Sequence, residues 1–501
     1  MNITLKMFPY KYMEYEKELM KREINKMFPG AKTISTEASI SLENFNEEYT
    51  PALDKLTYVM SYKHNGGCHL TLQAKLELCS ENGNHSKRQR TRYSTNGLHE
   101  YKGKFNPQIV HSIINILGIN NEMTVLDPFC GSGTTLLECQ HMGIYSIGID
   151  INPLAVYIAN TKITSLGIDV SHANRVLERI CNVAERTNAF ECESIDSRIS
   201  YLKKWIPLDV LAKIERIKDS LIMEEAAIAN FFMLLVSDLI RDYSNQEPSD
   251  LRIRKRFSSF PDKGFVDVLY SNALKLLNQI SKIQETIGCR NILNYAINSD
   301  FRRNVPSLNG RVFDAAITSP PYVTALPYID TQRLSLVWLN LSVPKHIAKL
   351  ESSLIGSRDM VKKEMKQWVY AMQNNGENLP QVIYELIVSM KKSLSKTDGF
   401  RKQAMPYLLY RYFTHMKRTF MNLRSIIRPN GHYAMVVGHN KTTLGDKTFR
   451  IDTPHLLGVI AKSCEWVIEE EMPLQTYKRY GLNSKNAINC ETLLILRNSR
   501  G

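Results

Sequence analysis

The sequence predicts an α/β protein built on a doubly wound sheet that ends in an antiparallel hairpin. Strand and helix patterns alternate between residues 96 and 164, which is how such a sheet begins. The strand pattern resumes over residues 291–330, and two strands separated by the loop "YKRYGLNSKN" end the segment 429–501. Two helical insertions and a small N-terminal α+β region complete the predicted architecture.

The N-terminal region, residues 1–95, begins with a charged amphipathic helix in "YEKELMKREINKMF". The stretches "KLTYVMSY" and "HLTLQAKLEL" alternate apolar and polar residues, so we expect two strands there. A basic connector, "SENGNHSKRQRTRYSTNG", follows. Its Arg88 and Arg90 can contact phosphate, and a solvated linker fits the same pattern equally well.

The predicted sheet starts after a helix in "NPQIVHSIINILGI". Residues 96–164 then supply a buried strand in "MTVLD", a helix in "LLECQHMG", a strand in "IYSIGIDI" and a helix in "NPLAVYIANTKI". Residues 291–330 add strands in "NILNYAINSD" and "RVFDAAITSPPY". Residues 429–501 add "GHYAMVVGHN", a helix in "TPHLLGVIAKSC", and the hairpin strands "EWVIEEEMPLQ" and "ETLLILRN".

Two segments without comparable strands, residues 165–290 and 331–428, are predicted to be helical insertions. The first contains the longest apolar run, "AAIANFFMLLVSDLI", which is too short for a membrane span and predicts a buried helix. It also contains "SDLRIRKRF", a dense group of basic residues: Arg252, Arg254, Lys255 and Arg256.

Composition limits the class of protein. The formal charge of +14 and the pI near 9.2 favour a polyanionic partner, with nucleic acid first, although a basic protein without such a partner has the same totals. The nine cysteines are odd in number and form no CxxC pair, which argues against a disulfide framework and a zinc site. The N-terminus has no signal-peptide core. We therefore expect a cytoplasmic protein that needs no metal.

The turn "VLDPFCGSGTT" predicts a ligand site. A strand delivers Asp127 to its carboxyl end, and Gly131 and Gly133 let the backbone approach a ligand before the next helix. The spacing departs from GxGxxG, and the turn has no P-loop lysine. A ligand with an ammonium and a carboxylate, such as the methionine part of S-adenosylmethionine, suits an acidic residue followed by a helix N-terminus.

Two further carboxylates end the next strands. Asp150 lies 17 residues after Gly133, about where a ribose-binding carboxylate is expected, and Asn152 and Pro153 can flank the adenine. Asp300, with Phe301 beside it, can accept from the adenine amino group. Each aspartate alone is better explained as a helix cap, but three at successive strand ends beside a Gly-rich turn favour a ligand site.

The tetrapeptide Ser319, Pro320, Pro321 and Tyr322 follows a buried strand. The prolines fix a rigid bend and leave carbonyl oxygens unpaired, while the serine hydroxyl is a second acceptor and the tyrosine a flat ring. Together they suit a planar ring with an exocyclic NH2 group, held for attack on a sulfonium methyl. A simple proline-rich turn would be preferred without the neighbouring cofactor pattern.

"DPFCGSGTT", "GIDINPLAV" and "TSPPY" resemble the DNA methyltransferases that modify cytosine N4 or adenine N6 amino groups. The resemblance implies a Rossmann-like methyltransferase sheet, with 96–164 as its cofactor-binding half and 291–330 as its catalytic half. It implies cofactor contacts from Phe129 and Thr134, and also from Lys104, Phe105 and Pro107 in "LHEYKGKFNPQIV". Serine at the first position of the tetrapeptide resembles the cytosine-N4 subgroup. Almost nothing separates Asp300 from Ser319, the usual place of target recognition, so we expect the insertions to recognise DNA.

The resemblance implies double-stranded DNA as substrate, a flipped target base, a cognate restriction endonuclease as partner, and association with a prokaryotic nucleoid. Adenine-N6 methylation shares nearly every feature. The N-terminal "FPYKYMEYEKELMKREINKMFPGA" also resembles the front of tRNA guanine-N2 methyltransferases, which keeps an RNA substrate open. A DNA-binding protein without catalysis is a third alternative, against which the intact tetrapeptide argues. No Pro-Cys dipeptide occurs, so cytosine-C5 methylation lacks its nucleophile.

Overall fold

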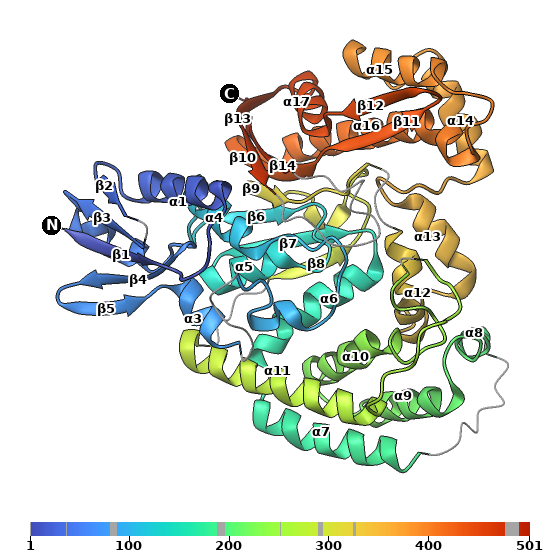
Figure 1. Cartoon of the computed structure of the whole chain (residues 1–501), viewed down its shortest axis with the longest axis horizontal. Helices are drawn as coiled ribbons and strands as arrows, with labels where there is room; N and C mark the ends of the chain where they lie inside the picture. Colours follow the sequence, from blue (N-terminus) through green and yellow to red (C-terminus); the bar gives the residue numbers. More distant parts are fainter. Residues whose placement is uncertain are drawn as a thin grey trace.

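A seven-stranded sheet runs through the centre of the computed structural model (Figure 1). Its strand order is β13-β14-β10-β9-β6-β7-β8. The strands are β6 (Thr124–Asp127), β7 (Tyr145–Asp150), β8 (Tyr295–Asn298), β9 (Phe313–Thr318), β10 (Ile427–Gly438), β13 (Trp466–Gln475) and β14 (Cys490–Asn498). The pairs from β8 to β10 are parallel, and β14 is antiparallel to both neighbours. The predicted doubly wound sheet with a terminal antiparallel hairpin is therefore confirmed.

The structure describes residues 2–36, 38–80, 88–187, 196–250, 252–288, 294–323, 327–475 and 490–500. The predicted loop "YKRYGLNSKN", residues 81–87 of the basic connector and the first three residues of "NILNYAINSD" lie outside these ranges.

The order in which strands are added to the sheet reverses between β6 and β9. The chain leaves β6 through α5 (Thr134–Met142) to β7, and leaves β7 through α6 (Pro153–Thr164). It returns on the other side of β6 as β9 and β10. In an open parallel sheet, the crevice for ligands lies at the carboxyl ends of the strands at this switch point. Asp127 and Thr318 occupy these two strand ends.

The N-terminal region forms a second, antiparallel sheet in the order β2-β3-β1-β4-β5. Its elements are β1 (Ile3–Met7), α1 (Glu14–Met27), β2 (Lys32–Ser35), β3 (Ser39–Glu43), α2 (Thr50–Leu53), β4 (Val59–His64), β5 (Gly67–Leu70) and α3 (Leu72–Leu78). It shares a hydrophobic core with α4 (Pro107–Leu117) and one face of the central sheet. On α1, Arg22 forms an ion pair with Glu470 of β13.

The prediction of a strand in "HLTLQAKLEL" is wrong for the second half of that segment. The segment "HLTLQAKLEL" enters β5 but turns into the helix α3 at Leu72. The side chain of Thr71 caps the helix by accepting from the backbone N–H of Ala74 at 3.2 Å. Gln73 and Glu77, one helical turn apart, form a buried hydrogen bond of 2.7 Å. The cap and this i,i+4 pair favour the helix over the alternating pattern.

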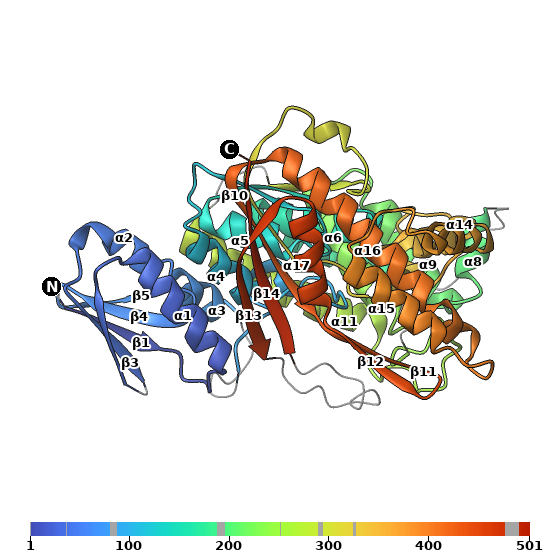
Figure 2. The same ribbon diagram turned by 90° about the horizontal axis from the view of Figure 1, so that it is seen from above.

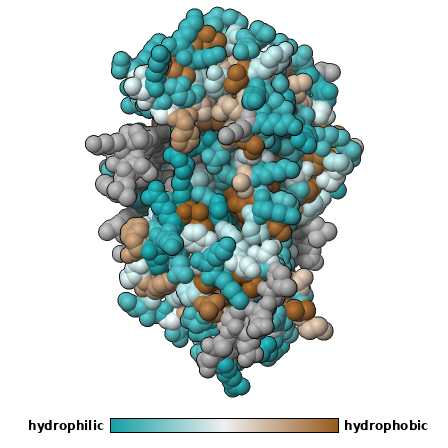
Figure 3. Space-filling view, turned by 90° about the vertical axis from the view of Figure 1, so that its right-hand side faces the viewer, coloured by the Kyte–Doolittle hydropathy of each residue, from teal (hydrophilic) through white to brown (hydrophobic). Residues whose placement is uncertain are grey.

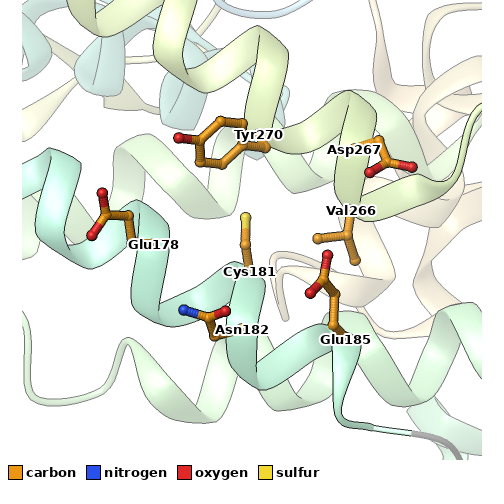
Figure 4. A pocket seen from close by; sticks show the side chains of 7 residues that line it. All are labelled: Glu178, Cys181, Asn182, Glu185, Val266, Asp267 and Tyr270. Atoms are coloured by element: carbon orange, nitrogen blue, oxygen red, sulfur yellow. The ribbon is translucent and has the colours of Figure 1, made fainter.

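The first insertion is helical, as predicted. It contains α7 (Val170–Glu185), α8 (Ser197–Leu202), α9 (Leu208–Ser220), α10 (Ala226–Ile240) and α11 (Phe265–Ile287). The apolar run forms α10, which is buried in the core of this insertion. A pocket of about 340 Å³ lies between α7 and α11, and Figure 4 shows Glu178, Glu185 and Asp267 on its walls. This acidic groove is defined by those three carboxylates.

The second insertion divides between two cores. Its helices are α12 (Tyr328–Trp338), α13 (Ile347–Ser353), α14 (Lys362–Gln373), α15 (Gln381–Lys392) and α16 (Phe400–Ile426). α12 packs with the first insertion, whereas α15 and α16 cover the face of the central sheet opposite the N-terminal region, together with α17 (Thr453–Ser463) (Figure 2). The sequence did not predict the ribbon of β11 (Asn440–Leu444) and β12 (Lys447–Ile451).

Trp338 joins the two insertions. Its side chain is fully buried at the end of α12, in the core that contains α7, α9 and α10. Its carbonyl accepts hydrogen bonds from Arg198 of α8 at 3.1 Å and from Lys218 of α9 at 3.1 Å. Both insertions are thereby fixed to one another beside the sheet.

Within the described ranges, none of the helices has the length and apolar character needed to cross a membrane.

We expect Trp338→Ala to lower the free energy of unfolding by about 3–5 kcal/mol, because it leaves a large cavity in this shared core. The measurement is denaturant unfolding followed by circular dichroism. The control is Leu208→Ala on α9, where the side chain is 56% exposed and the change should stay within about 0.5 kcal/mol. Equal stability of the two variants would contradict the joining role of Trp338.

Candidate active site

The Gly-rich turn between β6 and α5 has no space for larger residues. Gly131 and Gly133 have φ of 49° and 77°, in the left-handed region that favours glycine. A Cβ on Gly133 would lie 2.6 Å from the Cβ of Ala159 on α6. The turn therefore packs directly on α6. The Oγ of Ser132, between the glycines, is buried and has no hydrogen-bond partner among the described residues.

Asp150 fixes this turn from the neighbouring strand. Its carboxylate accepts from the backbone N–H of Gly131 at 2.9 Å and from that of Asn152 at 2.8 Å. Burial raises the pKa of Asp150 to about 6. Asn152 caps α6, accepting from the N–H of Leu154 at 3.1 Å, and Pro153 is the first residue of that helix. Asp150 therefore lies at the Gly-rich turn, next to the start of α6.

Asp127 connects the two central strands. Its Oδ1 accepts from the N–H of Phe129 at 3.1 Å and from the hydroxyl of Thr318, at the end of β9, at 2.5 Å. Asp127 is only 2% exposed, and this burial raises its pKa to about 7. The strand end that carries the Gly-rich turn is thus bonded to the strand end that carries the proline motif.

Residues 319–322, which the sequence predicts to be catalytic, form a bend after β9 that we name the catalytic bend for this predicted role. The hydroxyl of Ser319 donates to the carbonyl of Val436 at 3.3 Å, so its oxygen presents lone pairs as an acceptor. The hydroxyl of Tyr322 donates to Glu491 of β14 at 2.7 Å. The ring lies on Gly438 at the end of β10, where a Cβ would be 2.9 Å from the Cε2 of Tyr322. Gly438 and Glu491 are direct partners in the sheet.

Several residues expected to contact a cofactor have other partners. Asp300, at the end of β8, accepts from Arg302 Nε and Nη2, each at 2.7 Å. Burial raises the pKa of Asp300, and Arg302 more than offsets this, so the net pKa is lowered. Phe301 is only 4% exposed and lies in the core with α16. Asp300 therefore lies at the predicted strand end, and the Phe301 ring faces the core.

The segment expected to close over the cofactor contacts the turn through a different residue. Lys104 donates to the carbonyls of Thr91 at 3.1 Å and Asn96 at 2.9 Å, and burial lowers its pKa to about 7. Tyr101 instead lies on Gly131, where a Cβ would be 3.4 Å from its Cε1, and stacks on Tyr328 with ring centroids 6.3 Å apart.

The remaining predicted cofactor residues line the neighbouring structure. Phe105 packs partly buried against the core of the N-terminal region, and Pro107 is the first residue of α4. Phe129 packs partly buried on the opposite core, and Thr134 is the buried first residue of α5. The structure thus brings Asp127, Asp150, the Gly-rich turn and the catalytic bend together at the switch point.

Sequence reasoning missed three residues of this site. Tyr101 has no motif of its own. Lys162, fully buried on α6, donates to the carbonyl of Ser132 at 2.9 Å and supports the Gly-rich turn from behind. Glu491 is 169 residues from Tyr322. A lysine in the apolar stretch "NPLAVYIANTKI" was the one available signal, because a buried cation needs acceptors.

The predicted phosphate-binding residues differ in their surroundings. Arg88, Arg254 and Lys255 are exposed. Arg90 donates to the carbonyls of Glu77 at 2.9 Å and Ser80 at 3.3 Å. Arg252 is partly exposed. Arg256 donates to four protein carbonyls and lies 4.4 Å from the ring centroid of Phe260, so it supports its own loop.

Among the described residues, no group of His, Cys, Asp and Glu side chains could hold a metal ion.

The residues present fit S-adenosylmethionine. Two buried carboxylates, a turn whose glycines admit no side chain, and an unpartnered serine hydroxyl lie at the switch point of the sheet, where a nucleoside with an amino-acid tail has complementary polar groups. The fold and this site define an S-adenosylmethionine-dependent methyltransferase.

Comparison with known proteins finds similarity to methyltransferases. A family model described as DNA methylase, of the N6/N4 type, matches residues 7–161. The Type II methyltransferase M.BsoBI of Geobacillus stearothermophilus is 24% identical over 78% of this chain and 81% of its own length. The Type II methyltransferase M.MjaII of Methanocaldococcus jannaschii is 34% identical over 26% of this chain and 25% of its own. A tRNA (guanine(10)-N2)-dimethyltransferase of Methanothermobacter thermautotrophicus is 36% identical over 10% of this chain and 16% of its own.

Over these stretches the chain is similar to DNA methylases of the N6/N4 type and to Type II methyltransferases. The match of the family model begins in the N-terminal region and ends in α6.

We expect cofactor affinity to rise about a hundredfold between pH 5.5 and pH 7.5, because two carboxyl groups ionise over this range. Without ligand, the pKa of Asp127 is about 7 and that of Asp150 about 6. A protonated carboxyl must release its proton before it pairs with an ammonium or accepts from a ribose hydroxyl, so binding is weakened below these values. Isothermal titration calorimetry across this range, in buffers of different ionisation enthalpy, measures the affinity and the released proton. An affinity independent of pH would contradict the assignment, and Asp150→Ala should weaken binding at every pH.

Gly438→Ala should lower the turnover number at least tenfold while cofactor affinity stays unchanged. The new Cβ would lie 2.9 Å from the Cε2 of Tyr322 and would displace the ring. A misplaced ring would hold the target base poorly, which slows the reaction. Gly167→Ala is the matched control, because a Cβ there meets nothing within 4 Å. The readouts are methyl transfer under single turnover and calorimetric cofactor binding. Equal rates in both variants would show that the ring position is unimportant.

Proposed function

We propose that this enzyme transfers a methyl group from S-adenosylmethionine to the N4 amino group of a cytosine in a specific DNA sequence. The observation that carries the proposal is the catalytic bend at the switch point, with the Ser319 oxygen available as an acceptor and the Tyr322 ring against Gly438 at the sheet end. The relatives that cover most of the chain are Type II methyltransferases, which supports DNA as the substrate.

The target amino group is a poor nucleophile because its lone pair is delocalised into the ring. Its two N–H groups donate to the oxygen of Ser319 and the carbonyl of Pro320, which favours a geometry that frees the lone pair. Tyr322 stacks on the ring of the base, which has been flipped from the duplex. The cofactor supplies an electrophilic methyl group on a positively charged sulfur. With the cofactor bound, the sulfur–methyl bond would break as the nitrogen–methyl bond forms, leaving a neutral thioether, and the nitrogen would release one proton to solvent.

Serine at position 319 favours cytosine over adenine. Adenine-N6 methylation uses the same clamp and remains the second candidate. The short match to a tRNA dimethyltransferase, together with the resemblance at the N-terminus, motivates a test with RNA. DNA is favoured because that match spans only 52 residues.

The two helical insertions are the proposed recognition elements, and a restriction endonuclease with the same recognition sequence is the proposed partner. Residues 165–290 and 331–428 flank the catalytic bend in sequence, and Trp338 fixes them to one another. The exposed Arg254 and Lys255 lie in a loop of the first insertion. Such contacts make binding dependent on salt concentration.

The direct test incubates unmodified genomic DNA, and separately total tRNA, with the enzyme and methyl-labelled cofactor, and then identifies the labelled nucleoside. The expected product is N4-methyl-2′-deoxycytidine from the DNA. Ser319→Ala and Tyr322→Ala should each reduce transfer at least a hundredfold and leave cofactor affinity unchanged, because they remove the clamp and not the cofactor site. Label on adenine, or in tRNA only, would show that the proposed substrate is wrong. Full activity of both variants would exclude the proposed clamp.

A further inference from the structure

A short strap, residues 356–359, follows α13 and lies against the catalytic bend. Gly356 has φ of 74°, and a Cβ on it would be 2.2 Å from the carbonyl oxygen of Tyr322. The strap therefore touches the backbone of the residue that we expect to stack on the target base. It belongs to the second insertion, so this contact joins the insertion to the active site.

Arg411 holds the strap from its other side. This residue of α16 is only 3% exposed. Its Nη2 donates to the carbonyl of Ser357 at 2.6 Å, and both terminal nitrogens donate to the carbonyl of Asp359 at 3.3 Å. The N–H of Asp359 also donates to the Oγ of Ser357 at 3.1 Å. The backbone is thereby fixed on both sides of Arg358.

Arg358 itself is exposed. Burial of part of its guanidinium, and then the positive charges of Arg252 and Arg401, lower its pKa, while Asp359 opposes them. These neighbours come from the loop after α10 and from the first turn of α16. Three cations from separate segments thus place positive charge together, which favours the binding of a polyanion.

The surroundings suit a polyanion with planar bases. Phe257 and Phe400, in the segments that carry Arg252 and Arg401, are 82% and 80% exposed. α13 lies on the side of the molecule that faces the viewer in Figure 3, where the surface is mostly hydrophilic and its hydrophobic side chains are scattered. Exposed rings beside arginines are the usual composition of nucleic-acid contacts.

We propose that Arg358 binds the DNA phosphate adjacent to the flipped target nucleotide, and that the strap thereby positions the DNA backbone at the entrance to the catalytic bend. This inference rests on the proposed function and adds a binding site to it. A flipped base remains attached to its sugar and phosphates, so a cation two residues after Gly356, which contacts the Tyr322 backbone, is placed to hold one of them. A guanidinium can do so with two parallel hydrogen bonds.

The acidic groove provides a contrasting surface. Glu178 and Glu185 on α7, with Asp267 on α11, place negative charge on another part of the first insertion (Figure 4). Phosphate is disfavoured there, so an arginine on α7 is a suitable control. Arg175 is exposed on that helix.

The test compares wild-type enzyme with Arg358→Ala, Arg358→Lys and Arg175→Ala. A fluorescein-labelled duplex of mixed sequence reports binding by anisotropy across a salt series, and unmodified genomic DNA is the substrate for kinetics. For Arg358→Ala we expect the slope of log affinity against log salt to fall by about 1 and the KM for DNA to rise about tenfold. Arg358→Lys should keep the slope, because the charge remains, and recover part of the KM. Arg175→Ala should match the wild type.

Cofactor affinity and circular dichroism of each variant confirm that it is folded. If the wild-type enzyme methylates DNA and a folded Arg358→Ala shows an unchanged salt slope and KM, this inference is overturned and the proposed function stands. A wild-type enzyme that does not methylate DNA would overturn the proposed function and this inference with it. An equal loss in Arg175→Ala would show that only overall charge matters, which also overturns the site.

Discussion

The hydrogen bond between Thr318 and Asp127 is the contact on which the site depends. It joins the carboxyl ends of two adjacent parallel strands, one leading to the Gly-rich turn and the other to the catalytic bend. Because both groups are buried, the bond is made in a low dielectric and breaking it would leave a carboxylate without its partner. The Gly-rich turn and the catalytic bend are therefore held at a fixed separation, as the proposed methyl transfer between two bound molecules would require.

Further hydrogen bonds and packing contacts hold the Gly-rich turn and Tyr322 on either side of this contact. Asp150 and Lys162 bond to the backbone of the Gly-rich turn from neighbouring elements. On the other side, Gly438 and Glu491 fix the plane and hydroxyl of Tyr322. The polar groups are satisfied mostly by the protein itself, so little rearrangement is needed when ligands arrive. A preorganised site of this kind lowers the cost of reaching the reactive geometry.

The sequence predicted the parts of the structure that depend on local pattern. Strand–helix alternation gave the sheet, and the aspartates at strand ends marked the switch point. Local pattern was insufficient for "HLTLQAKLEL", where the cap at Thr71 and the Gln73–Glu77 pair favour a helix. It also could not reveal Glu491, because that contact joins residues far apart in the chain, or the burial of Phe301, which is determined by packing against α16. Lys104 is another such case, since its acceptors are backbone carbonyls that no side-chain pattern encodes.

The packing of α1 beside β13 has a consequence for solubility. β13 is the last strand of the central sheet, and among the described strands none pairs with its outer side. Unpaired strand edges template aggregation unless a protein covers or charges them. Met472 and Leu474 of β13 share a core with Leu19 and Met20 of α1, and Arg22 pairs with Glu470. The N-terminal region thus protects an edge that would otherwise associate with a second copy, and its removal would expose that edge together with an apolar face of the sheet.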